Sequence, residues 1–169
     1  MSLVVLIGAS GAGKTTIARA IEDRCAGSVE VFFFDRIGVP SPERMIEEHG
    51  SGEQWQRAKT IEWMSRLARR VKPGRQILFE GQTRLAFLEE GAAAAGPLAF
   101  RPVLIDCDDT TRTTRLTRDR GQPELATEGM LNWARYLRRE AKDRGCAILD
   151  TSTLSLDDAV SYVMARLAD

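Results

Sequence analysis

The sequence predicts an α/β fold in which residues 1–169 form one domain, with a five-stranded parallel sheet and helices on both faces. The chain has 169 residues, a length typical of a single domain, and its short apolar runs alternate with stretches of helical periodicity. A glycine-rich turn also joins the first apolar run to the first helical stretch, as in many βα units. In such sheets ligands bind at the carboxyl ends of the strands, so we expect candidate site residues there.

Five apolar runs predict the strands. Each run is short and is bounded by glycine, proline or charged residues, as buried parallel strands usually are. The second strand should end at Asp35 and the third at Glu80-Gly81, which places carboxylates at the expected ligand edge. The predicted strands cover residues 2–7, 29–34, 76–79, 102–106 and 147–150.

Capping residues and apolar spacing predict the helices. Ser41-Pro42 and Thr127 are typical helix starts, and Asp108 or Asp109 is expected to cap the helix after the fourth strand. We expect residues 92–95 to form a loop or a frayed helix end. Helical segments are predicted at 16–21, 52–71, 84–90, 110–118 and 130–141, with two more starting near residues 42 and 155.

The residues from Gly8 to Thr15 form a complete G-x-x-x-x-G-K-[ST] motif directly after the first strand. Backbone N–H groups in such a loop bind anions, and the following helix adds the positive end of its dipole. Its glycines let the backbone turn tightly and approach phosphate closely. A chance glycine-rich turn is the alternative, but the flanking strand and helix favour a nucleoside triphosphate site. The candidate nucleotide-binding residues are Gly8, Ser10, Gly11, Ala12, Gly13, Lys14, Thr15 and Thr16.

Charged and hydroxyl side chains at this edge are candidates for catalysis. Lys14 should reach the β- and γ-phosphates of the nucleotide, and the Thr15 hydroxyl should bind Mg²⁺. Asp35 can orient an attacking hydroxyl or hold Mg²⁺, and Glu80 can do either as well, so both assignments stay open. Ordinary turn or cap residues are the alternative for both carboxylates. Asp106 should lie at the same edge.

A cluster of arginines follows the fourth strand. A spacing of three residues places Arg112, Arg115 and Arg118 along one helical face, and Arg120 enters Gly121-Gln122-Pro123, which cannot stay helical. An arginine-rich lid over a phosphate site would stabilise charge on a transferring group and exclude water. A solvated basic face is the alternative, and it is favoured most for Arg112.

Composition and charge argue against several other classes of protein. Lys plus Arg and Asp plus Glu both number 24, and this zero net charge argues against binding to nucleic acid or an anionic membrane. A single histidine disfavours a histidine-based zinc site or a Ser-His-Asp hydrolase. The three cysteines form no C-x-x-C pair, and no signal peptide or long apolar stretch is present. We therefore expect a soluble, cytoplasmic protein.

With these motifs, the chain resembles the small phosphate-loop kinases related to nucleoside monophosphate kinases, especially shikimate kinase and gluconate kinase. The resemblance covers nearly the whole chain in the order of its elements, and the phosphate loop is its most specific part. It implies a three-layer P-loop NTPase fold with strand order 2-3-1-4-5. It also implies acceptor-binding helices at about residues 36–72 and a short lid at about residues 118–127.

The same resemblance implies roles for individual residues. Asp35 matches an aspartate that contacts the acceptor hydroxyl, and Arg57 falls where an arginine grips the acceptor carboxylate. Arg115 matches an arginine that stacks on adenine. Thr151 and Ser152 belong to a stretch similar to the one whose following loop borders the adenine, which adds both residues to the expected nucleotide site.

The chain departs from these families at two places. Glu80-Gly81-Gln82 stands where shikimate kinases carry a glycine triplet. Gln122 stands where their lid arginine precedes the proline, so Arg120 or Arg118 must act as the lid arginine. The resemblance thus implies the type of reaction but not the acceptor, whose site should be more polar. The candidate acceptor-binding residues are Asp35, Arg57, Glu80, Gln82, Arg84 and Arg135.

These observations predict an ATP-dependent kinase that uses Mg²⁺ and moves the γ-phosphate to a hydroxyl of a small polar metabolite. Lys14, Asp35, Arg118 and Arg120 are its candidate catalytic residues, and Thr15 and Asp35 its candidate metal ligands. A nucleotide kinase or nucleic-acid end kinase is one alternative, and a non-enzymatic ATP-binding switch is another. The expected partner is the small-molecule acceptor, and the protein is expected to be a monomer or a homodimer.

Overall fold

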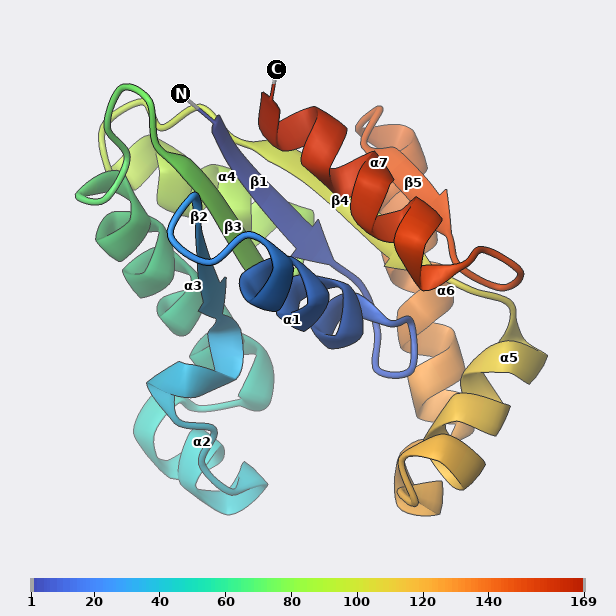
Figure 1. Ribbon diagram of the computed structural model, residues 1–169. Helices are drawn as coiled ribbons and strands as arrows, with labels where there is room; N and C mark the ends of the chain where they lie inside the picture. Colours follow the sequence, from blue (N-terminus) through green and yellow to red (C-terminus); the bar gives the residue numbers. More distant parts are fainter. Residues whose placement is uncertain (1, 169) are drawn as a thin grey trace.

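The central sheet has five parallel strands in the order β2-β3-β1-β4-β5, in a computed structural model that describes residues 2–168 (Figure 1). This order confirms the predicted fold class. The strands are β1 Ser2–Ile7, β2 Val29–Phe33, β3 Gln76–Gly81, β4 Arg101–Asp106 and β5 Ala147–Asp150. Because all strands run the same way, their carboxyl ends meet along one edge, which is where ligands bind in open parallel sheets.

Helices cover both faces of the sheet. Helices α1 (Lys14–Arg24) and α7 (Leu156–Ala168) pack on one face. Helices α3 (Gly52–Ala68), α4 (Leu85–Ala94) and α6 (Glu128–Asp143) pack on the other. The shorter helices are η1 Phe34–Ile37, α2 Pro42–His49, α5 Asp109–Thr114, the π-helical turn η2 Arg115–Asp119 and η3 Pro123–Leu125. None of the helices in the described residues is long and apolar enough to cross a membrane.

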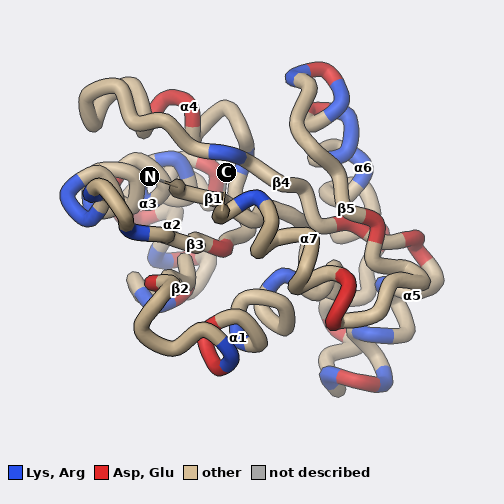
Figure 2. The backbone as a smooth tube through the Cα atoms, turned by 45° about the horizontal axis from the view of Figure 1, so that its top comes forward, with Lys and Arg blue, Asp and Glu red and all other residues tan. Residues whose placement is uncertain are grey.

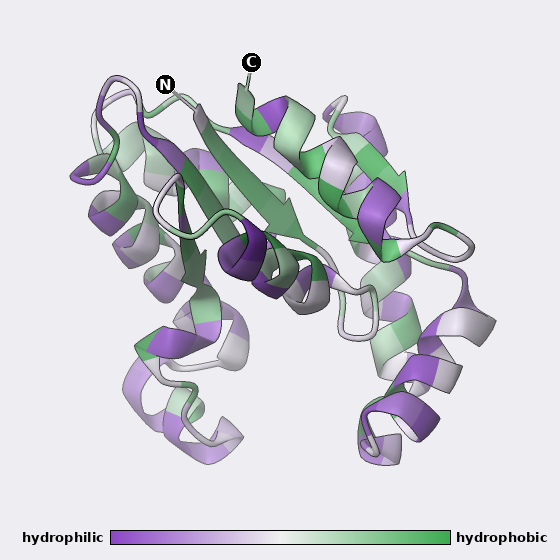
Figure 3. Ribbon diagram, viewed as in Figure 1, coloured by the Kyte–Doolittle hydropathy of each residue, from purple (hydrophilic) through white to green (hydrophobic). Residues whose placement is uncertain are grey.

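The central strand β1 holds the two layers of core together. Its alternate residues point to opposite faces: Leu3, Val5 and Ile7 pack with the α3, α4 and α6 layer. Val4 and Leu6 pack with α1 and α7. All of these side chains are 3% exposed or less, and the strands are accordingly the most hydrophobic part of the ribbon in Figure 3. The end of β1 is thereby fixed in place, and with it the loop that follows.

Two polar arms extend past the carboxyl edge of the sheet, on either side of α1 (Figures 1 and 3). One is built around α2, and the other contains α5, η2 and η3. Charges of both signs are spread over the helices and loops (Figure 2), in keeping with the zero net charge. The arms lie where the acceptor-binding helices and the lid are expected.

Most predicted helix starts are confirmed by cap hydrogen bonds. The side chains of Ser41, Asp108 and Thr127 each accept a hydrogen bond from the backbone N–H three residues later. A cap from a distant residue could not be predicted: Glu140 of α6 accepts bonds from the backbone N–H groups of Leu85 and Ala86 at the start of α4. This carboxylate joins α4 to α6.

Three predicted boundaries were wrong. Helix α4 continues to Ala94, because alanine is a strong helix former and Ala92 is buried against the core. Helix α3 ends at Ala68 rather than near Val71. Strand β2 ends at Phe33, and Asp35 lies in the short helix η1, where its side chain is exposed.

The contact between α3 and α4 depends on a glycine. A Cβ atom on Gly91 would lie 2.8 Å from Met64 Cγ and 3.1 Å from Ile61 Cα, closer than side chains pack. We predict that Gly91→Ala lowers the free energy of unfolding by about 1–3 kcal/mol, the usual cost of overpacking. Gly129→Ala in α6 is the matched control, because its Cβ would meet only Thr127 Oγ1 at 3.6 Å. Urea unfolding of both variants checks this; equal stability would contradict it.

Candidate active site

The phosphate loop between β1 and α1 is shaped by close contact with its surroundings. A Cβ atom on Gly8 would lie 2.2 Å from the carbonyl oxygen of Ile105, so only glycine fits there. Gly13 caps the start of α1 with a φ of 97°, a left-handed conformation that side chains rarely adopt. The loop therefore begins in close contact with β4 at Gly8 and ends at Gly13, where α1 starts.

Four successive carbonyl groups of the loop accept hydrogen bonds from side chains. The pairs are Lys14 Nζ to Ala9 at 3.2 Å, Arg112 Nη1 to Ser10 at 2.7 Å, Arg115 Nη1 to Gly11 at 3.4 Å and Thr151 Oγ1 to Ala12 at 2.9 Å. Because the N–H and C=O of a trans peptide point in opposite directions, carbonyls held by the protein leave the intervening N–H groups facing away from it. Such an orientation is typical of an anion-binding nest, although the Ala12 N–H donates to the Ala9 carbonyl within the loop at 3.4 Å.

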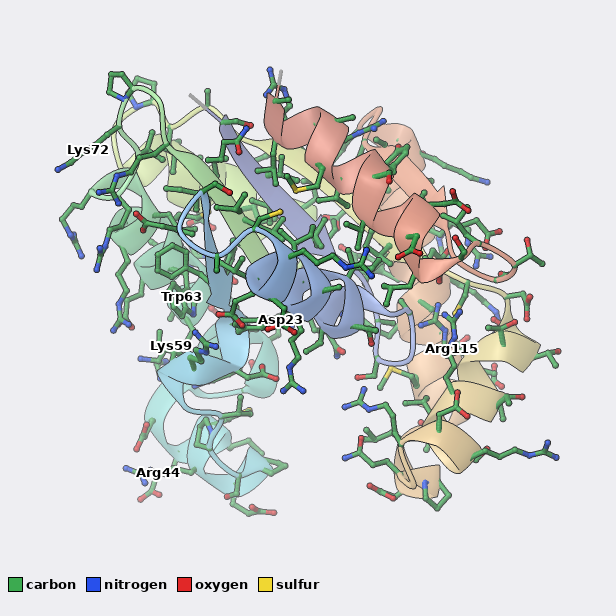
Figure 4. The ribbon with its side chains drawn as sticks, viewed as in Figure 1. Asp23, Arg44, Lys59, Trp63, Lys72 and Arg115 are labelled. Atoms are coloured by element: carbon green, nitrogen blue, oxygen red, sulfur yellow. The ribbon has the colours of Figure 1, made fainter. Side chains whose placement is uncertain are left out.

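A cavity of about 520 Å³ lies against the loop and extends toward the start of α7. Arg115 forms part of it and is shown beside the loop in Figure 4. Its guanidinium is fixed by two bonds to Thr151, from Nη1 to Oγ1 at 2.9 Å and from Nη2 to the carbonyl oxygen at 2.7 Å. The lining residues are Gly11, Gly13, Lys14, Thr15, Thr16, Ile17, Arg19, Arg115, Asp119, Arg120, Thr151, Leu154, Ser155, Leu156 and Ala159.

Lys14 carries a buried charge at this cavity. Lys14 is only 7% exposed, and this burial is the main cause of the lowered pKa of its side chain. The charges of Arg112 and Arg120 lower the pKa further, whereas Glu80 and Asp35 raise it. A cation that has lost its water and is close to other cations gains from the arrival of a phosphate.

Glu80 is the buried carboxylate of the site. It is the last residue but one of β3, at 5% exposure, and its Oε1 accepts a hydrogen bond of 3.2 Å from the Thr15 hydroxyl. Burial raises the pKa of Glu80, Lys14 opposes that shift, and the charge of Asp35 adds to it. Glu80 and Asp35 therefore lie on the same side as Thr15 and Lys14, within electrostatic reach of each other.

The segment from Gly81 to Arg84, which follows Glu80, connects the phosphate loop with α3. The Gln82 side-chain oxygen accepts a bond of 3.0 Å from the Ser10 hydroxyl, and the Gln82 carbonyl accepts one of 2.9 Å from Gln56. The hydroxyls of Thr83 and Thr60 share a buried bond of 2.6 Å. These bonds anchor the segment to the loop on one side and to α3 on the other.

Arg84, at the end of this segment, lies beside aromatic rings. Its guanidinium carbon lies 4.9 Å from the Tyr136 ring centroid and 5.5 Å from that of Trp133, and these two rings stack on each other. Its Nη2 donates to Glu53 at 2.9 Å. Gln82 thus contacts the phosphate loop and α3, and Arg84 contacts α3 and α6.

Other candidate residues have partners elsewhere. Arg57 is bonded to Glu90 of α4, and Arg135 to Asp109 and Glu128. Within residues 2–168, neither has a hydrogen bond or ion pair with Gln82 or Arg84. The Ser152 hydroxyl bonds Asp150 and accepts from the N–H of Asp108, and Ser152 is not part of the cavity lining. Of the two lid candidates, Arg120 lines the cavity and Arg118 does not.

One expectation at this edge was wrong, and Asp106 ends β4 at this edge as expected. Arg112 lies neither on a solvated face nor in a lid: it is 0% exposed and packs behind the loop. Asp106 is buried as well, at 4%, and accepts hydrogen bonds from Arg112 at 2.6 Å and Arg138 at 2.5 Å. Sequence reasoning also missed Arg19, which lines the cavity from α1. Its position one helical turn after Thr15 is the signal that points to it.

Comparison with known proteins identifies the fold. No model of a known protein family matches the chain. A nucleotide-binding protein of Rhodospirillum rubrum is 30% identical over 156 residues, which cover 90% of this chain and 43% of that protein. The chain therefore spans less than half the length of this curated relative.

Solved kinases share the fold over at least nine-tenths of their length. Shikimate kinase from Acinetobacter baumannii is 19% identical with a TM-score of 0.65, over 99% of this chain and 93% of that one. A gluconokinase from Sinorhizobium meliloti 1021 is 17% identical with a TM-score of 0.64, over 99% and 91%. Deoxyadenosine kinase from M. mycoides is 14% identical with a TM-score of 0.65, over 100% of both. The chain thus has the fold of the small P-loop kinases.

The buried carboxylate leads to a prediction about stability and pH. Because the pKa of Glu80 is raised in the folded state, the stability that its neutral form contributes is lost as pH rises through the folded pKa. Without nucleotide and Mg²⁺, Glu80→Gln should therefore be more stable than the parent chain at pH 7.5. A gain of 1 kcal/mol corresponds to roughly 2–4 °C in Tm for a chain of this size.

Thermal unfolding between pH 5 and pH 8 measures this effect. The advantage of Glu80→Gln should shrink as pH falls, because the parent carboxylate then takes up its proton. Glu124→Gln, which replaces an exposed carboxylate of η3, serves as the control and should show no such trend. A lower Tm for Glu80→Gln than for the parent chain at every pH would contradict the account.

Proposed function

We propose that this chain is an ATP-dependent kinase that transfers the γ-phosphate to a hydroxyl group of a small polar metabolite. The observation that carries the proposal is the meeting of a phosphate loop, Lys14 and Thr15 with two carboxylates, Glu80 and Asp35, beside a polar surface formed by Gln82 and Arg84. A nucleotide switch needs the loop but has no need of an acceptor surface next to it. The fold shared with solved kinases supports the same reaction type.

The nucleotide occupies the cavity beside the loop in this proposal. Its phosphates follow the loop from residue 8 to residue 16, and its base lies toward Arg115 and the loop from Thr151 to Leu156. A guanidinium held by two bonds to Thr151 presents a flat cation to an aromatic base. Ser152 supports that loop through its bonds to Asp150 and Asp108.

The side chains present fit a Mg²⁺ ion that arrives with the nucleotide. Residues 2–168 contain no group of three or more His, Cys, Asp or Glu side chains that would hold a metal by themselves. Mg²⁺ commonly binds through one or two protein ligands together with phosphates and water. The Thr15 hydroxyl and a carboxylate, Glu80 or Asp35, would hold it. When bound, the ion neutralises charge that develops on the phosphates.

Asp35 is the group proposed to orient the acceptor. It is exposed on η1, free to meet a ligand, and can accept the proton that the acceptor hydroxyl loses. The acceptor oxygen bonds to the γ-phosphorus as the bond to the β,γ-bridging oxygen breaks, and ADP leaves. Lys14 and the lid arginines Arg118 and Arg120 stabilise the charge on the transferring group.

The acceptor lies against Gln82 and Arg84, with Arg57 and Arg135 at the outer side of its site. The helices between residues 36 and 72 and the lid between residues 118 and 127 close over it, in a single kinase domain of the cytoplasm. The protein acts as a monomer or homodimer. A nucleotide acceptor is the second candidate, because the stacked rings of Trp133 and Tyr136 beside Arg84 offer a flat apolar face to a base.

Transfer of labelled γ-phosphate from Mg-ATP tests the proposal. The acceptor pools are nucleosides, nucleotides, sugars and sugar acids, hydroxy acids, aminoglycosides and short oligonucleotides, with Lys14→Ala as the blank. We expect a labelled product in one pool that the blank lacks, and Asp35→Asn should reduce its rate by about 10²–10⁴-fold, the usual contribution of a general base.

Asp23→Asn, an exposed substitution on α1, is the matched control for Asp35→Asn (Figure 4). It should leave the rate unchanged, and both variants should bind ATP like the parent chain. ATP binding without labelled product in any pool would favour a nucleotide switch. Product formation at the parent rate by Asp35→Asn would remove Asp35 from the mechanism.

A further inference from the structure

We infer that Arg112 is a positioning residue for the nucleotide phosphates, acting through the backbone of the phosphate loop. The inference rests on the proposed nucleotide site, but it assigns a role to a side chain that does not reach the cavity. Arg112 is the largest of the fully buried side chains, at 0% exposure. A buried guanidinium is costly unless its donors are paired, so its contacts indicate what it does.

The guanidinium of Arg112 bridges the sheet and the loop. Its Nη1 donates to the carbonyl of Ser10 at 2.7 Å, which is the shortest of the side-chain bonds to the loop carbonyls. Its Nη2 donates to Asp106 Oδ1 at 2.6 Å and to the carbonyl of Cys107 at 3.3 Å. Because the guanidinium is planar and donates from both of its ends, it fixes the position of the Ser10 carbonyl relative to Asp106, which the single ammonium group of a lysine cannot do.

The stem of Arg112 also forms the floor under the loop. A Cβ atom on Gly11 would lie 3.1 Å from Arg112 Cγ and 3.2 Å from the Arg112 carbonyl oxygen. The loop thus rests directly on this side chain and is bonded to its tip. Removal of the side chain would leave the Ser10 carbonyl without its donor and free the peptide to rotate, which turns the adjoining N–H away from the phosphates.

Charge supports the same role. Asp106 is one carboxylate bonded to two guanidiniums, those of Arg112 and Arg138, and of these two only Arg138 has the charges of Asp109 and Asp150 nearby as well. The charge of Arg112 is near enough to lower the pKa of Lys14. In a poorly hydrated site such a cation attracts phosphates that it never touches. Arg112 Nε is buried without a hydrogen-bond partner in the described part of the chain, so one donor of the guanidinium stays unpaired.

Arg138 offers a matched control because it shares every partner of Arg112 except the loop. It donates to Asp106 Oδ2 at 2.5 Å and to the Cys107 carbonyl at 3.3 Å, and it comes from α6. Because Arg112 is fully buried and Arg138 is 36% exposed, a role confined to holding Asp106 and the end of β4 would lower the stability of their variants to different extents but would cause no loss specific to Mg-ADP. A role in phosphate binding separates them.

Calorimetric titration with Mg-ADP tests the inference on the full chain. We expect Arg112→Met to weaken binding at least tenfold and Arg138→Met less than threefold. Arg112→Lys, which keeps the charge but not the two-ended bridge, should lie between them. Titration with adenosine, which has no phosphate, should give the same affinity for all folded variants.

The outcomes separate the inference from the proposed function. Binding of Mg-ADP by Arg112→Met as tightly as by the parent chain, or equal losses in Arg112→Met and Arg138→Met, would overturn the inference alone. If the parent chain itself fails to bind Mg-ADP, both are overturned. Should Arg112→Met not fold, Arg112→Lys and the double variant with Asp106→Asn and Arg112→Met decide: parent affinity in either one overturns the inference, and a loss limited to Mg-ADP supports it.

Discussion

The site depends on one constraint, which is that the carbonyl groups of the phosphate loop must be bonded on the protein side. A loop of this kind binds anions through its N–H groups, and these face a ligand only if the carbonyls turn away from it. Lys14, Arg112, Arg115 and Thr151 supply the bonds. The donors come from α1, α5, η2 and the residue that follows β5. Elements that are far apart in the sequence therefore meet around one short loop.

Buried charge is the second organising feature. Lys14 and Glu80 lie near each other and are poorly hydrated. Burial lowers the pKa of Lys14 and raises the pKa of Glu80, so it favours the neutral form of each. Arg112 and Asp106 form a buried ion pair behind the loop. Such groups cost stability in the absence of ligand, and under the proposed function a phosphate and a divalent cation would complete their coordination. In this proposal, the charged side chains of the site are already in place before the ligand binds.

Sequence patterns predicted the sheet, the phosphate loop and the carboxylate at the end of β3, because each depends on neighbours in sequence. They failed for Arg112, whose burial is decided by the carbonyl of Ser10, 102 residues away. A spacing of three placed it on one face with Arg115, but only the packing of α5 against the loop shows that this face is buried. The partners of Arg57 and Arg135 are likewise chosen by distant carboxylates, Glu90 and Asp109, which no local pattern shows.

The chemistry of the acceptor is the part least accessible to sequence patterns, because Gln82 and Arg84 contact residues from two different helices, α3 and α6. The claim on which the rest depends concerns the loop, and backbone amide NMR of the full chain tests it most directly. On titration with Mg-ADP, the amide signals of residues 10–15 should shift and saturate, whereas adenosine should leave them in place. Mg-ADP that binds while those amides stay unmoved would contradict the account.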